Sequence, residues 1–189
     1  IHSGQVLCLA WHSLGRTPLL ASSSANHDVA LWRWHSGGLQ LQWHVKGAHE
    51  AAVCCLCWWG LGNSSRLASG SWDGSIKVWP APIDRAKWSK DAALAVSHWT
   101  AHHGRVNGLV LSTDGKYLCS TSPSGAIHVW SIEDFTRQSC LRLPIGSNHS
   151  CQVSCVGEEM LLLGYDEGSV VVWDMDSITS HLDTNCARS

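Results

Sequence analysis

The feature that most constrains this chain is a pair of sequence markers that recur four times along it. One marker is a histidine followed four residues later by a valine, and the other is a tryptophan that closes a short apolar run. These markers are His2, His49, His102 and His149, and Trp32, Trp79, Trp130 and Trp173. Successive markers of one kind lie 43 to 53 residues apart. A period of this size indicates repeated supersecondary units that bury a core only when they stack.

Short apolar runs separated by turn signals fill each repeat. In the second repeat these runs predict strands over residues 52–59, 66–70, 75–79 and 92–98. The third repeat opens with a predicted strand over 105–111. Asp73-Gly74, between two runs of the second repeat, is a dipeptide typical of tight turns. Because dense short strands occur without helical periodicity, the sequence predicts an all-β fold.

The composition is that of a globular protein without a strong charge bias. Of the 189 residues, 44% are hydrophobic and 15% are charged, and the formal net charge is −2. Proteins that bind nucleic acid or membrane surfaces usually carry a basic excess, so we expect neither as a general partner. The apolar runs are strand-sized, so no transmembrane helix is predicted.

The nine cysteines do not form a recognisable disulfide framework. Their number is odd, and several lie within predicted strands among apolar neighbours, where a free cysteine behaves as a small buried hydrophobe. A reducing compartment accounts for them most simply. We therefore expect no disulfide and an intracellular protein, either cytoplasmic or nuclear.

The repeats are similar in sequence to a known family. Residues 67–79 read LASGSWDGSIKVW, and a related run in the third repeat ends at Trp130. Taken over all four repeats, these residues resemble the WD-repeat family of β-propeller proteins. The resemblance implies an all-β WD-repeat β-propeller with four blades, each a four-stranded antiparallel sheet, and therefore a partial propeller.

We expect one partial propeller over the whole chain. Its predicted parts are blade 1 at 1–45, blade 2 at 46–98, blade 3 at 99–145, blade 4 at 146–177 and a polar tail at 178–189. The sequence begins at Ile1, inside a repeat, so we expect a piece of a longer protein. Four blades of this kind are not expected to close a ring alone. The remaining blades would come from flanking sequence or from a partner chain.

The resemblance also implies a buried network in each blade. A turn aspartate binds the histidine, the histidine binds a strand serine, and the serine binds the tryptophan. The second repeat supplies all four residues, as His49, Ser69, Asp73 and Trp79. The corresponding side chains elsewhere are His2, Ser22, Asn26 and Trp32; His102, Ser120, Ser124 and Trp130; and His149, Leu163, Glu167 and Trp173. We expect the second network to be complete and those of the third and fourth repeats to be looser.

The sequence predicts no catalytic residue, metal ligand or cofactor. Cys54, Cys55 and Cys57 are close in sequence, but side chains alternate across a strand, so neighbours should face opposite sides. Ser69, His49 and Asp73 are the residue types of a nucleophilic triad, but the resemblance places them in a buried structural network. We therefore do not expect an enzyme active site in this chain.

The tryptophans suggest where partners bind. Trp11, Trp58 and Trp59 end predicted first strands and are expected to pack between blades. Trp72 precedes the turn aspartate, in a loop that the family often presents on its binding face, although packing against a neighbouring blade is an alternative. The predicted partner-binding residues are Trp72, Arg105, Asn107 and Asp166.

We therefore predict a protein–protein interaction scaffold within a larger intracellular complex, with other proteins or peptides as partners. Two alternatives remain open. The chain could be the non-catalytic propeller domain of a larger enzyme or signalling protein, or it could recognise histone tails or nucleic acid.

Overall fold

The structure is a computed structural model, and it describes residues 1–13, 18–81, 95–142, 151–156, 160–165 and 170–174. These residues form fifteen strands and one short 3-10 helix, Gly62–Ser64. They divide into two compact units, Ile1–Val106 and Asn107–Ser189, which are described separately. The prediction of an all-β fold is confirmed.

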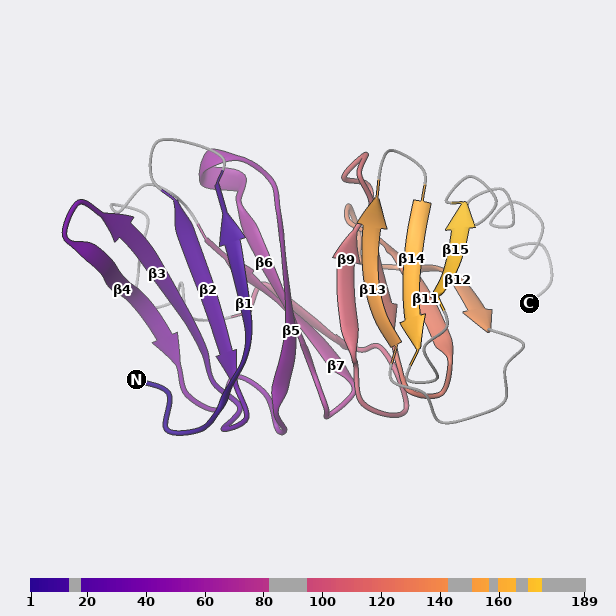
Figure 1. Ribbon diagram of the computed structural model, residues 1–189, viewed down its shortest axis with the longest axis horizontal. Helices are drawn as coiled ribbons and strands as arrows, with labels where there is room; N and C mark the ends of the chain where they lie inside the picture. Colours follow the sequence, from indigo (N-terminus) through magenta and orange to yellow (C-terminus); the bar gives the residue numbers. More distant parts are fainter. Residues whose placement is uncertain (14–17, 82–94, 143–150, 157–159, 166–169, 175–189) are drawn as a thin grey trace. The chain divides into compact units, whose positions relative to one another are not determined.

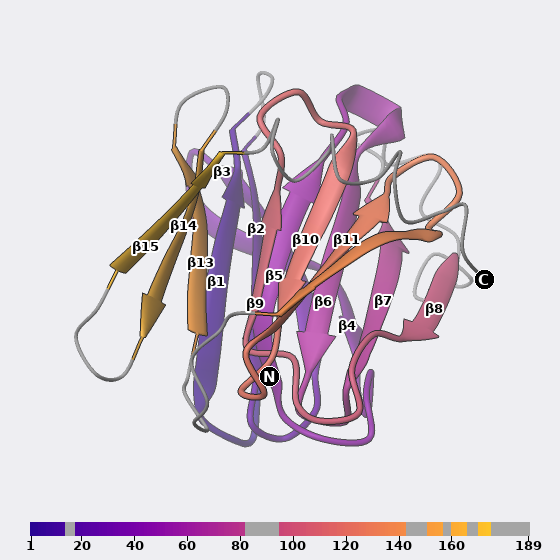
Figure 2. The ribbon, with the colours of Figure 1, turned by 90° about the vertical axis from the view of Figure 1, so that its right-hand side faces the viewer.

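The first unit contains two antiparallel sheets, each of four strands in sequence order (Figures 1 and 2). Each sheet is an up-and-down meander in which every strand pairs with the next. The first consists of β1 (Val6–His12), β2 (Leu19–Ser24), β3 (Val29–His35) and β4 (Gly38–Val45). The second consists of β5 (Val53–Trp59), β6 (Arg66–Ser71), β7 (Ser75–Pro80) and β8 (Ser97–Thr100).

The second unit contains one sheet of four strands and one of three. The four strands are β9 (Gly108–Leu111), β10 (Tyr117–Thr121), β11 (Ala126–Ser131) and β12 (Arg137–Arg142). The three are β13 (Cys151–Val156), β14 (Met160–Tyr165) and β15 (Val170–Asp174). Three sheets thus have the predicted four strands. The fourth has three among the described residues, and the remaining polar tail lies outside them.

Two predicted strands differ from those observed by more than one residue at an end. A strand was predicted over residues 92–98, whereas β8 spans Ser97–Thr100, and residues 92–94 lie outside the described set. A strand was also predicted over 105–111, whereas β9 begins at Gly108. The reason is that the amide of Val106 donates to Ser71 O at 2.9 Å instead of joining β9. Hydrogen bonding thus ties this residue to the first unit.

The core of the first unit lies between its two sheets. In the first sheet, Ala10, Ala21, Leu31 and Trp43 are paired across neighbouring strands and so share one face. This face packs against β5, β6 and β7 of the second sheet. Leu67 of β6 is completely buried within the shared cluster. The two sheets therefore stabilise each other, as stacked repeats must.

The opposite face of the first sheet is apolar but exposed. The register places Trp11, Leu20, Trp32 and Leu41 in one row across the four strands there, with Leu9 one alternation along β1. Leu20, inside this row, is buried. The exposed fractions are 60% for Leu9, 54% for Trp11, 49% for Trp34, 44% for Leu39 and 38% for Leu41. No described blade packs on Trp11, so its packing between blades stays a prediction. Trp58, by contrast, stacks on His12 of the first sheet, with ring centroids 4.9 Å apart.

None of the described residues forms a helix long and apolar enough to cross a membrane.

The shared core of the first unit yields a stability prediction. Leu67→Ala removes a side chain with no exposed surface, so we expect it to lower the free energy of unfolding by about 2–5 kcal/mol. Urea denaturation would measure the change. Leu61→Ala is the matched control, because Leu61 is 63% exposed and its truncation should be close to neutral. Equal effects of the two substitutions would contradict the assigned core.

Candidate functional site

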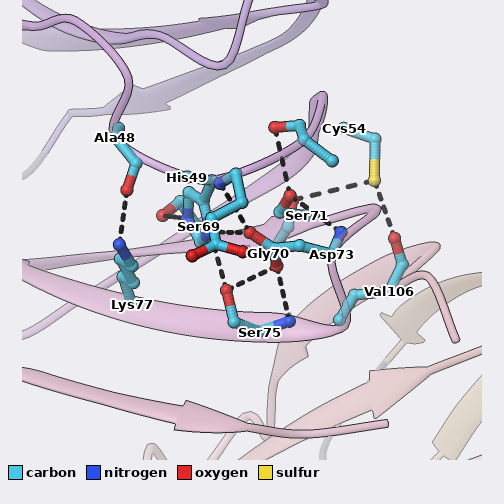
Figure 3. A network of polar contacts seen from close by, with 12 residues as sticks. Ala48, His49, Cys54, Ser69, Gly70, Ser71, Asp73, Ser75, Lys77 and Val106 are labelled. Carbon is cyan, nitrogen blue, oxygen red and sulfur yellow. Dashed lines mark hydrogen bonds and ion pairs between the residues drawn. The ribbon is translucent and has the colours of Figure 1, made fainter. Parts of the chain in front are cut away.

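A buried polar network lies at the loop end of the second sheet (Figure 3). The Trp79 indole on β7 donates to Ser69 Oγ on β6 at 2.8 Å. Ser69 Oγ lies 2.7 Å from His49 Nε2, and His49 precedes β5. His49 Nδ1 lies 2.8 Å from Ser75 Oγ and 3.4 Å from Asp73 Oδ2. The structure thus brings the four residues predicted for this repeat into one chain.

Ser75 was not predicted, yet it relays the contact between the histidine and the aspartate. Its hydroxyl donates to Asp73 Oδ1 at 2.5 Å, and its amide donates to the same oxygen at 2.7 Å. Every proton has an acceptor if Ser69 donates to His49 Nε2 and His49 Nδ1–H donates to Ser75 Oγ. The network therefore favours the neutral Nδ1–H tautomer of His49.

The electrostatics of the network follow from burial. Burial lowers the pKa of His49 to about 4, although the neighbouring Asp73 carboxylate opposes the shift. Burial alone would raise the pKa of Asp73. Hydrogen bonds from Ser75 and from the Glu50 amide outweigh it and hold that pKa below its ordinary value. The pair is therefore a neutral ring beside a carboxylate at neutral pH.

Gly74 shapes the turn between β6 and β7. Its φ is +85°, a left-handed conformation that glycine adopts without strain. A Cβ at this position would lie 2.4 Å from His102 O and 2.9 Å from Gly104 O. Residues 101–104, at the beginning of the third repeat, therefore lie against this turn. Gly74 O accepts the amides of Ala101 and His102.

The first repeat forms only part of the predicted network. His2 Nε2 lies 2.7 Å from Ser22 Oγ, which accepts the Trp32 indole N–H at 2.8 Å. Asn26, predicted at the acid position, does not meet His2. Its amide donates to Ser3 Oγ and to Asp28 Oδ2, each at 2.7 Å. The prediction for Asn26 is wrong because its side-chain amide donates to the Asp28 carboxylate and not to His2.

The third and fourth repeats are described in part. In the third, the Trp130 indole donates to Ser120 Oγ at 2.9 Å, and Ser124 bonds Ser122 at 2.7 Å. His102 is buried in the first unit. In the fourth, Trp173 lies on β15, but its side chain is outside the described set. His149, Leu163, Asp166 and Glu167 cannot be compared with the predicted network, because either the residue or its side chain lies outside that set.

Two of the four predicted partner-binding residues form an exposed pair. Trp72 is 48% exposed, and the Arg105 guanidinium carbon lies 5.6 Å from the centroid of its ring. This distance is within the range of a cation–π interaction. Asn107 belongs to the second unit, where its amide donates to Thr121 O, so no spatial relation to the pair is drawn.

Cys54 lies beside this pair, and its placement differs from the prediction. Strand alternation predicted Cys54 and Cys55 on opposite faces, but their sulfur atoms lie 3.9 Å apart. A β-bulge between Val53 and Cys55 interrupts the alternation. The Cys55 thiol lowers the pKa of Cys54 despite burial, with further help from Trp72 and Arg105. Both cysteines are free thiols here, and the expected absence of disulfides stays a prediction.

Comparison with known proteins agrees with this architecture. The family described as WD domain, G-beta repeat matches residues 1–33, 41–80 and 94–131, which is more than half of the chain. The chain belongs to the WD40 repeat family. No curated protein sequence matches it significantly.

Solved structures share the WD40 fold at low sequence identity. One titled "Structure of U3-55K" is 20% identical with a TM-score of 0.74, covering 93% of this chain and 50% of that chain. The WD40 β-propeller domain of Doa1 is 19% identical with a TM-score of 0.69, covering 91% and 51%. The computationally designed Ika4 protein is 21% identical with a TM-score of 0.66, covering 92% and 93%. The chain thus spans about half the length of the U3-55K and Doa1 chains. At these identities the likeness shows the fold alone, which is the WD40 propeller.

The buried ring of His49 predicts a pH dependence. The folded-state pKa of about 4 lies below the ordinary 6.5, so the unfolded chain takes up the proton more readily. Stability from the neutral ring is therefore complete above pH 6.5 and is lost as the pH falls through about 4. We expect a loss on the order of 3 kcal/mol.

Urea denaturation across this pH range would measure the loss. His49→Gln removes the titrating ring and should flatten the pH dependence. His35→Gln, at an exposed position, should keep the slope of the unmodified protein. An unchanged slope in His49→Gln would show that other groups cause the dependence.

Proposed function

We propose that the chain is a protein–protein interaction scaffold within a larger intracellular assembly, and that it is not itself an enzyme. WD40 propeller domains generally mediate protein–protein interactions, and the fold is typically non-catalytic. The buried network supports the second part of the proposal. The Ser69 side chain is fully buried, and its hydroxyl bonds His49 and Trp79, so it has no access to a substrate.

The observation that carries the proposed partner site is the exposed Trp72–Arg105 pair. An exposed tryptophan offers a large rigid apolar surface, and tryptophan and arginine are both enriched at binding hot spots. The Arg105 guanidinium can bind a carboxylate of the partner with paired N–H donors. The pair therefore suits a peptide that places an acidic side chain beside an apolar one.

Hydrogen bonds fix the backbone of the loop that carries Trp72. The Trp72 amide donates to Ala52 O at 2.9 Å, and the following residue belongs to the Asp73 turn. The ring is thus exposed on a loop whose backbone is fixed by the network below it. An anchor held in this way loses little conformational freedom on binding.

A substitution of the ring tests the proposed site. Trp72→Ala in the full-length protein should weaken partner binding by about 2 kcal/mol or more, while the melting temperature changes little. Affinity purification identifies the partner, and titration of the purified pair measures the change. Leu61→Ala, which truncates another exposed apolar side chain, is the control. Lost stability with unchanged affinity would mean that Trp72 serves packing only.

We also propose that a further propeller blade covers the exposed apolar face of the first sheet. Leu9, Trp11 and Trp34 contribute to this face, and Trp11, Pro18 and Trp34 line a shallow apolar hollow of about 430 Å³. A contiguous apolar face on a sheet whose other face is packed is typical of an interface. The covering blade would come from flanking sequence or from a partner chain.

The covering blade has a consequence for the 189 residues alone. We expect them to self-associate at micromolar concentration, because the apolar face is then uncovered. Leu9→Glu should reduce association in light scattering by placing a charge on that face. Leu61→Glu, at a similarly exposed position that does not belong to the first sheet, should not. A monodisperse monomer without any substitution would refute the proposal.

A further inference from the structure

We propose that His2, Asp28 and His44 form a binding site for a divalent transition metal ion, with zinc as the best-suited ion. One ligand atom from each of the three residues lies within 4.8 Å of the other two. Two imidazole nitrogens and one carboxylate, with a position left for water, are a ligand set that zinc takes in proteins. The proposal does not depend on the proposed partner site.

The fold of the first sheet brings the three residues together. Asp28 is the residue before β3, in the turn that follows β2. His44 lies on β4 and pairs with Ala30 of β3, so it stands beside the beginning of that strand. His2 precedes β1 and is held by Ser22 of β2. Three segments far apart in sequence thus converge, which is why short ligand spacings along the chain do not reveal the site.

The polar atoms have the orientation that a metal site needs. His44 Nε2 lies 3.0 Å from Asp28 Oδ2. His2 Nδ1 is buried and has no hydrogen-bond partner among the described residues. Its other nitrogen faces Ser22, so a proton on Nε2 leaves the Nδ1 lone pair available to an ion.

Contacts outside the three residues hold them in place. Asp28 Oδ1 accepts the Gly47 amide at 3.0 Å, and Asp28 Oδ2 accepts the Asn26 amide at 2.7 Å. Ser22, the partner of His2, is fixed in turn by the Trp32 indole. Such outer contacts orient ligands in natural metal sites. Zinc binds such atoms at about 2.0–2.2 Å, so the His2 and His44 rings, both partly exposed, must turn to close on it.

The second sheet offers an internal comparison. The register pairs Lys77 with His98, as it pairs Ala30 with His44 in the first sheet. At the place of Asp28, however, the second repeat has Ser75. There the histidine before the first strand already bonds Ser75 through Nδ1. The second repeat therefore has histidines at both matching positions. It has no carboxylate at the position of Asp28, and the first of its histidines has no free ring nitrogen.

The test is titration of the protein with zinc ions against a chromogenic chelator, followed by cobalt substitution. Where the protein is produced with Ile1 as its first residue, that amino group is acetylated, because a free amine next to His2 chelates metals by itself. We expect one zinc ion per chain and the visible absorption of tetrahedral cobalt. His44→Gln and Asp28→Asn should each weaken binding at least tenfold.

Two controls make the result decisive. His98→Gln removes the matching histidine of the second sheet and should leave the affinity unchanged. The melting temperature of each variant, measured with chelator present, shows whether the fold is retained. His44 is partly exposed, so His44→Gln should fold even if Asp28→Asn does not. No stoichiometric ion, or equal affinity in His44→Gln and the unmodified protein, would overturn the proposal.

Discussion

The second blade depends on the hydrogen-bonded chain that runs from Trp79 through Ser69, His49 and Ser75 to Asp73. These hydrogen bonds link the paired strands β6 and β7 to the segment before β5 and to the turn after β6. Neither that segment nor that turn belongs to the backbone ladder of the sheet. Buried polar groups stabilise a fold only when each has a partner, and here every donor has an acceptor. In the same turn, the Gly74 carbonyl accepts the amides of Ala101 and His102, which adds a further tie within the first unit.

The features that recur in every repeat, namely the strands and the network residues, could be predicted from the sequence. The features that depend on the direction of a single side chain or amide could not. The recurring histidines and tryptophans predicted the fold, and the resemblance to the WD-repeat family implied His49, Ser69, Asp73 and Trp79 as the second network. Ser75 was missed because its role depends on the direction of its hydroxyl, and a serine after an Asp-Gly turn is common. The start of β9 was missed because Val106 gives its amide to Ser71, a choice that strand patterns do not encode.

Local departures from strand geometry explain the other differences. The bulge between Val53 and Cys55 brings together two sulfur atoms that alternation separates, and the first sheet has a similar bulge between Val6 and Cys8. The first repeat has Asn26 and Asp28 where the second repeat has Asp73 and Ser75, and Asn26 and His44 both bond the Asp28 carboxylate. These two differences separate the closed network of the second blade from the cluster of His2, Asp28 and His44 in the first.

The contrast between the two blades shows where new function can arise in such a fold. In the second blade His49 uses both ring nitrogens within the network, so it has no free lone pair or proton for a ligand. In the first blade, which has Asn26 and Asp28 in place of Asp73 and Ser75, His2 Nδ1 has no partner among the described residues. A blade that satisfies all its polar groups internally leaves its loops as the place for binding, as we propose for Trp72. A blade that departs from the pattern can leave a polar atom of the network free for a ligand, as we propose for His2 in the first blade.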